Sequence, residues 1–363
     1  MSQEQAEQQA SHEPARSHRW RGPALFVLKV GLAAALIGWL LRAEALDLGA
    51  LGLLWRSPLL LGANLLCWLT CSVVLSTLRW RALLTLAEVR LSVPRATQLQ
   101  LMALFLNVAI PGNVGGDVVK ALAVAREQPS ERRPAILLVV LVERMLGLVG
   151  LVAAGALGTM LGGPTLWRSA ALRPTVTATA VLGAGLLLGP LVVFVALRRW
   201  GMALRRFTRG SSRLARLGDG LLAAIAMLVR RPAVLGICLL MSMAMHGVSM
   251  AYLTLLTQAI TGQAAQIGAI ATVFPLGLLT VVLPVSPAGI GVGHVAFEQL
   301  YRAIGLSGGA TVFNVFLIGQ ITPCLLGALP FLGLRRQQAA LARAADRAPT
   351  APASSSLSTA KPR

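Results

Sequence analysis

Six apolar stretches of the chain are long enough to cross a membrane as helices, and they limit the fold more than any other feature. A crossing of about 30 Å of hydrocarbon takes roughly 20 helical residues. Hydrophobic residues make up 56% of the 363 residues and charged residues 13%, far from the composition of a soluble domain. The sequence therefore predicts an all-α polytopic membrane protein, with full spans near 24–41, 58–78, 134–160, 174–197, 233–257 and 309–333.

Two further apolar stretches are interrupted by proline and glycine. The first, 98–126, breaks at Pro111 and the second, 267–303, breaks at Pro284. In each, a Gly-rich turn follows the proline and a new helical stretch begins after it. A matched pair of such broken segments is the best sequence indication of a binding site in a membrane transporter. Non-helical backbone at membrane depth occurs where it is buried in protein or lines a cavity.

The distribution of basic residues predicts the topology. The net charge is +20, and the stretch 198–232 alone carries nine arginines against one aspartate. Nucleic-acid binding would explain such a charge in a soluble protein, but in a membrane protein the positive-inside rule explains it better, and we expect no nucleic-acid partner. The rule places 198–232 and both termini in the cytoplasm.

The same rule decides how the broken segments cross. If 98–126 crossed the membrane once, the arginine-rich stretch 198–232 would lie outside. We therefore predict that 98–126 is a re-entrant hairpin that enters and leaves on the cytoplasmic side. The segment 267–303 follows an uncharged outer loop, so its hairpin enters from the outside. Two hairpins from opposite faces are typical of an inverted repeat.

Each predicted hairpin places a helix N-terminus near the middle of the membrane. The helices restart around 115–117 and 289–291. Free backbone N–H groups and the positive end of the helix dipole attract phosphate or carboxylate there, and the glycines allow a ligand to approach closely. Close helix packing is the ordinary reason for a glycine pair in a membrane helix, but two matched breaks favour a ligand site.

Charged residues inside the apolar stretches give a second indication of a site. Glu143 and Arg144 lie close to the middle of 134–160, where a charge costs roughly 2.5–3.5 kcal/mol. Asp117 and Lys120 are three residues apart and share a helix face. Internal ion pairs, with Asp117 as a partner of Arg144, would explain these residues, and so would a polar pathway for a lipid headgroup.

The second broken segment carries a similar pair. His294 and Glu298 lie one turn apart on its outgoing helix. They too fit either an internal contact that holds the hairpin or a polar pathway.

These residues make the chain resemble the lysylphosphatidylglycerol synthase/flippase transmembrane-domain family. One family motif is Asn, Pro-Gly and Gly-Gly-Asp, with Glu-Arg in the next span. The other is Pro-x-Ser-x-x-Gly-Ile-Gly followed by an acid. In this chain His294 stands in place of that acid. The resemblance covers about 20–335, and its motif residues are Asn107, Pro111, Gly112, Gly115, Gly116, Asp117, Glu143, Arg144, Pro284, Ser286, Gly289, Ile290 and Gly291.

The resemblance implies a flippase-like protein that moves a phospholipid or polyprenyl-phosphate-linked lipid between leaflets. Its partners would be membrane lipids with an anionic headgroup, and a lipid-modifying enzyme is a candidate partner. Bifunctional relatives carry a soluble aminoacyltransferase domain, which we do not expect here. The expected substrate-binding and pathway residues are Asn107, Pro111, Gly115, Gly116, Asp117, Lys120, Glu143, Arg144, Pro284, Ser286, Gly289, Gly291, His294 and Glu298.

Two other functions stay open. A polytopic lipid-modifying enzyme would use Asp117, Glu143 or His294 as acid or base, and a scaffold would assist an envelope lipid synthase. The sequence shows no nucleophile motif and no metal-ligand pattern, so we assign no catalytic residue, metal or cofactor. We expect a bacterial inner-membrane protein with cytoplasmic termini, in which a membrane domain at 20–335 lies between disordered segments at 1–18 and 344–363.

Overall fold

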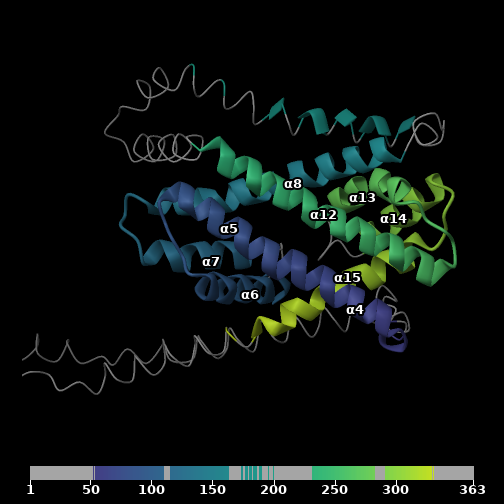
Figure 1. Cartoon of the computed structure of the whole chain (residues 1–363), viewed down its shortest axis with the longest axis horizontal. Coiled ribbons are helices and arrows are strands. Elements are labelled where there is room, and N and C mark those ends of the chain that lie inside the picture. The colour runs from purple at the N-terminus through teal and green to yellow at the C-terminus, as the bar shows by residue number, and fades with distance from the viewer. Residues whose placement is uncertain are drawn as a thin grey trace, which may run out of the picture.

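Every regular element in the described part of the chain is a helix (Figure 1). The structure is a computed structural model. It describes 54–109, 115–162, 231–282 and 291–328, together with a few isolated residues, most of them between 173 and 199.

Four of the described helices are long and apolar enough to cross a membrane, which confirms the predicted all-α membrane fold. The predicted span 24–41 lies outside the described residues and 174–197 is described only in fragments, so the total of six spans stays a prediction. The four are Pro58–Ala87, Arg133–Leu161, Pro232–Thr261 and Gly309–Leu326.

The first of these spans is longer than the sequence predicted. It begins at Pro58, where the Ser57 hydroxyl accepts a hydrogen bond from Leu60 N, an arrangement typical of a helix start. It ends before Glu88, whose φ of 58° is left-handed. Its consecutive parts are α4 (Pro58–Trp68), the π-helical segment η1 (Leu69–Leu75), α5 (Ser76–Leu84) and the short 3₁₀ segment η2 (Thr85–Ala87).

The segment 98–126 forms a helical pair rather than one long helix. Its arms are α6 (Val93–Ala109) and α7 (Gly115–Arg126), which pack against each other. Helix α7 begins at the glycine where the sequence predicted the helix to restart. The two loops that flank the pair are joined by an ion pair 3.2 Å long between Arg132 and Glu88. The pair therefore starts and finishes at one end of the bundle.

The segment 267–303 forms a second helical pair at the opposite end of the bundle (Figure 1). Its arms are α13 (Ile267–Val282) and α14 (Val292–Ala303), which also pack against each other. The loops that flank it are joined by a hydrogen bond of 3.0 Å from Ser307 N to the Gln263 side chain. This pair too starts and finishes at a single end.

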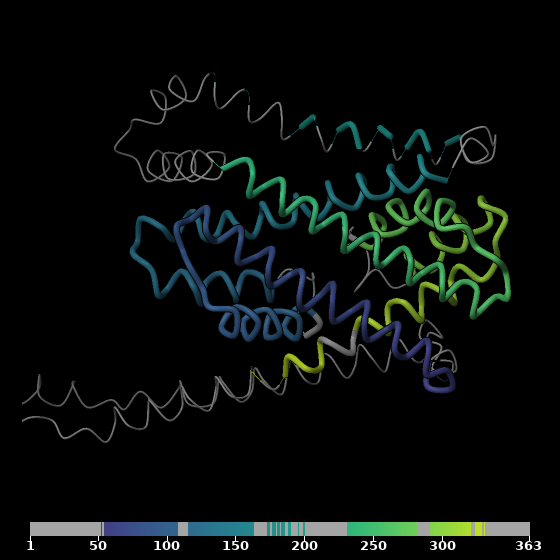
Figure 2. Tube along the Cα trace, viewed as in Figure 1, coloured from purple at the N-terminus to yellow at the C-terminus, as the bar shows by residue number. Residues whose placement is uncertain are grey.

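Three long helices complete the described fold: α8 (Arg133–Leu161), α12 (Pro232–Thr261) and α15 (Gly309–Leu326). The chain thus runs twice through a long helix, a helical pair and another long helix, as Figure 2 shows. Each half also packs against helices of the other half. Helix α8 of the first half packs on α12 and α13, and α15 of the second half packs on α4 and α6.

Each helical pair has its own core. Buried side chains of α5 to α8, with Trp80, Leu83 and Ile136 among the largest, form one cluster. The other cluster includes buried side chains of α12 to α15. In it, the rings of Phe297 and Phe313 stack with their centroids 4.6 Å apart. One cluster therefore holds the start of α7 in place, and the other cluster holds the start of α14.

Candidate functional site

Lys120 is the centre of a buried charged cluster. Its side chain on α7 is fully buried, and its Nζ lies 3.1 Å from Glu143 Oε2 and 3.3 Å from Asp117 Oδ1. It also donates a hydrogen bond of 2.9 Å to Gln100 Oε1 on α6. Its Nζ further lies 4.9 Å from the ring centroid of Trp80. The ammonium group has three donors, and these contacts join α6, α7 and α8 through one side chain.

Arg79 is the member of the cluster that the sequence did not indicate. The predicted span 58–78 ended just before Arg79, whereas the structure continues the helix and buries this residue within α5. One guanidinium nitrogen lies 3.3 Å from Glu143 Oε1, and the other donates a hydrogen bond of 2.7 Å to Ser242 Oγ on α12. A signal was present, because Glu143 in an apolar span needs a cationic partner.

Arg144 pairs with Asp117, as the sequence suggested. The two residues differ in exposure, since the Arg144 side chain is 41% exposed and the Asp117 side chain 11%. Asp117 lies in the first turn of α7, where the helix dipole favours a negative charge. Arg144 is thus the most exposed of the five charged side chains of the cluster.

The described members of this cluster carry an excess of positive charge. Three are cations and two are carboxylates. Burying an ion is costly unless an opposite charge compensates it. The five members are Arg79, Asp117, Lys120, Glu143 and Arg144.

Asn107 and Gly116 hold the start of α7 against α6. The Asn107 Oδ1 accepts a hydrogen bond of 2.8 Å from Gly116 N. A Cβ atom on Gly116 would lie 2.0 Å from the backbone oxygen of Ala103. The N–H of Gly116 already has a partner and its Cα packs against a backbone, so close packing accounts for this glycine better than approach of a ligand. Gly115, half-buried, is the first residue of α7.

His294 and Glu298 make contacts of a different kind at the second helical pair. The His294 Nδ1 accepts a hydrogen bond of 3.3 Å from Gly291 N, and its ring meets Phe313 edge-on with centroids 5.1 Å apart. Glu298 accepts a hydrogen bond of 3.1 Å from Ala310 N in the first turn of α15. These contacts fix the starts of α14 and α15, and neither links its residue to Lys120.

The family of the chain follows from a comparison with known families. The model of the family described as "Lysylphosphatidylglycerol synthase TM region" matches residues 26–330. The chain belongs to this family. No curated protein and no solved structure matches it significantly.

The structure brings some of the predicted site residues of this family member together. It brings together Asp117, Lys120, Glu143 and Arg144 and places Asn107, Gly115 and Gly116 beside them. Among the described residues, His, Cys, Asp and Glu form no group of three that could hold a metal ion. The predicted site residues that lie outside the described part are Pro111, Pro284, Ser286 and Gly289.

Proposed function

We propose that the protein moves a lipid with an anionic phosphate headgroup between the leaflets of a membrane. The observation that supports this proposal is the excess of positive charge among the described members of the cluster around Lys120. A single phosphodiester supplies the one negative charge that would balance it. Arg144, the most exposed cation of the cluster, is the residue that we expect to meet the headgroup first.

The carboxylates of the cluster support a binding role rather than acid–base catalysis. Asp117 contacts Lys120 and Arg144, and Glu143 contacts Lys120 and Arg79. Each acid therefore has two cationic partners inside the protein. A headgroup phosphate that approaches Arg144 competes with Asp117 for the guanidinium, which suggests an exchange of partners as the lipid moves.

The helical pairs are proposed to be re-entrant hairpins that enter from opposite faces of the membrane. Support comes from the contacts that tie each pair to one end of the bundle and from their location at opposite ends (Figure 1). In each half, the long helix that follows the helical pair packs on helices of the other half, and this reciprocal packing supports an inverted repeat. We further propose a membrane domain at 20–335, a bacterial inner-membrane location and cytoplasmic termini.

Lipid translocation in reconstituted vesicles tests this function. The probe is a headgroup-labelled phosphatidylglycerol, whose movement to the outer leaflet makes it accessible to a membrane-impermeant quencher. We expect the wild-type protein to move the probe faster than protein-free vesicles do, and Arg144→Gln to lose most of this activity. Arg132→Gln is the matched control, since Arg132 pairs with Glu88 in a loop. Equal rates with and without wild-type protein would contradict the proposal.

A further inference from the structure

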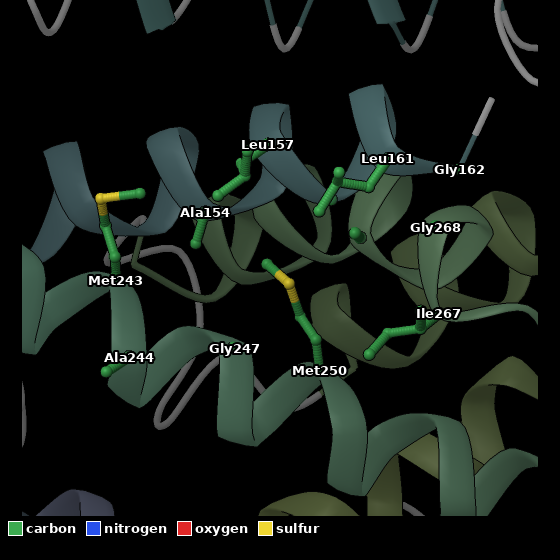
Figure 3. A pocket seen from close by; sticks show the side chains of 12 residues that line it. Ala154, Leu157, Leu161, Gly162, Met243, Ala244, Gly247, Met250, Ile267 and Gly268 are labelled. Carbon is green, nitrogen blue, oxygen red and sulfur yellow. The ribbon is translucent and has the colours of Figure 1, made fainter. Parts of the chain in front are cut away.

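An apolar groove separates α8 and α12 on the side of the bundle. Figure 3 shows that Met243 and Met250 of α12 reach toward Ala154 and Leu157 of α8 across this gap. The cavity has a volume of about 370 Å³, at the lower end of the roughly 300–1,000 Å³ common for ligand sites. The residues that line it are all apolar: Ala154, Leu157, Gly158, Leu161, Gly162, Met243, Ala244, Gly247, Met250, Ile267, Gly268 and Ala271.

The groove exists because the two helices splay apart. At one point they touch closely, since a Cβ atom on Gly150 would lie 2.4 Å from Ser242 Cβ. Farther along, Gly158 of α8 meets α13 instead, where its Cβ atom would lie 2.4 Å from Ala271 Cβ. Gly247 of α12 has no atom within 4 Å of the position of a Cβ. Helix α13 thus forms the floor of a wedge that is closed at Ser242.

We propose that this groove binds one hydrocarbon chain of a membrane lipid. Helices α8 and α12 are both candidate membrane spans, so the medium beside them is hydrocarbon. Leu157 and Leu161 line the groove and are 48% and 79% exposed, so it is open to that medium. A lining without polar side chains gives a headgroup no partner, whereas it matches an acyl or isoprenoid chain.

The walls of the groove favour an occupant that varies in shape. Methionine is flexible and polarisable and adapts to different apolar partners, and Met243 and Met250 are the largest side chains that α12 contributes. Gly247 between them leaves room for a chain to lie against the helix backbone. This site differs from the charged cluster, and the inference does not depend on lipid translocation.

Photo-crosslinking in vesicles tests the proposal. The full-length protein is reconstituted with a phosphatidylcholine that carries a diazirine near the middle of one chain, and labelled peptides are mapped by mass spectrometry. The zwitterionic headgroup makes the readout independent of any preference of the charged cluster for anions. We expect stronger labelling of 154–162 and 243–250 than of the outer face of α12 around Leu240, which is 65% exposed.

Two glycines of α12 provide a matched pair of variants. Gly247→Leu fills the groove, and Gly236→Leu adds the same side chain where no atom lies within 4 Å and outside the groove lining. Both changes replace glycine by a better helix former. We expect Gly247→Leu to reduce labelling of the groove severalfold and Gly236→Leu to leave it unchanged. Ala244→Leu, also in the lining, serves as a second filling variant if Gly247→Leu does not fold.

Three results would overturn the proposal. Labelling no stronger in the groove than around Leu240 would mean ordinary boundary lipid. Unchanged labelling in folded filling variants would place the chain elsewhere. The third result would come from a bifunctional crosslinker attached to Gly247→Cys. If it joined the groove to a second copy or to the segment 173–199, and no lipid label appeared there, that copy or segment would be the occupant.

Discussion

Lys120 of α7 and Glu143 of α8 form a buried ion pair in which Nζ lies 3.1 Å from Oε2. The pair joins the first helical pair to the span that follows it. Because Lys120 also lies 3.3 Å from Asp117, one ammonium group separates two carboxylates. Without it, two acids in a region of low dielectric would keep only arginine partners.

Replacing Lys120 should destabilise the fold strongly. Removing one partner of a buried ion pair costs about 3–5 kcal/mol, so we expect Lys120→Met to lower the unfolding temperature in detergent and the yield of folded protein. Adding Asp117→Asn should recover part of the loss, because one of the two carboxylates that contact the Lys120 ammonium group is then neutral, and Arg144, its other partner, is 41% exposed. Arg302→Met is the control, since Arg302 is 73% exposed and pairs with Glu298 on the surface. Wild-type stability of Lys120→Met would contradict the assigned burial.

The two arginines of the cluster should differ in their effect on stability. The Arg79 side chain is 10% exposed and that of Arg144 is 41% exposed. Arg79→Gln leaves Ser242 without its donor, whereas Asp117 keeps Lys120 after Arg144→Gln. We expect a larger drop in unfolding temperature for Arg79→Gln. A larger drop in unfolding temperature for Arg144→Gln than for Arg79→Gln, measured under identical detergent conditions, would contradict the deeper burial of Arg79.

The glycines at the starts of α7 and α14 should respond differently to alanine. In Gly116→Ala the new methyl group would lie 2.0 Å from the Ala103 oxygen, so α6 and α7 must separate and little folded protein is expected. Gly291→Ala meets open space, but φ is 82°, which costs about 1–3 kcal/mol for a residue other than glycine. Fluorescence-detected size-exclusion chromatography measures both yields. A normal yield of Gly116→Ala would contradict the close contact of α6 and α7.

Cysteine labelling tests the proposed orientation of the hairpins. Ser130 and Ser307 are exposed in the loops that follow α7 and α14, and the four native cysteines are buried. In intact cells, Ser307→Cys should react with an impermeant maleimide and Ser130→Cys should react only after the membrane is opened. Reaction of both cysteines from the same side would exclude hairpins from opposite faces.

The sequence was sufficient for features that depend on local patterns. Glycine runs marked the start of α7 at Gly115, and the cost of a charge in an apolar span indicated the pair of Asp117 and Arg144. Arg79 was missed because the change from apolar to basic residues after 78 is also typical of a loop. Its burial depends on Ser242, which is distant in the sequence.

A contact of the second helical pair could not be predicted from the sequence either. Glu298 and His294 lie one turn apart in the sequence, which suggested a shared polar pathway. The contact of Glu298 with Ala310 N exists because α15 begins against α14, and no local pattern encodes this contact.

The most direct test of headgroup recognition by the charged cluster compares lipids that differ in headgroup charge. Labelled phosphatidylglycerol and phosphatidylcholine are followed in vesicles that contain wild-type protein or Arg144→Gln. Both lipids carry a phosphodiester, but only phosphatidylcholine adds a cation, which the excess positive charge of the cluster should disfavour. We expect the wild type to move phosphatidylglycerol about tenfold faster, a difference of ~1.4 kcal/mol in the barrier. Arg144→Gln should lose most of this preference. Equal rates for the two lipids in the wild type, or an unchanged preference in Arg144→Gln, would contradict the proposal that the charged cluster handles an anionic headgroup.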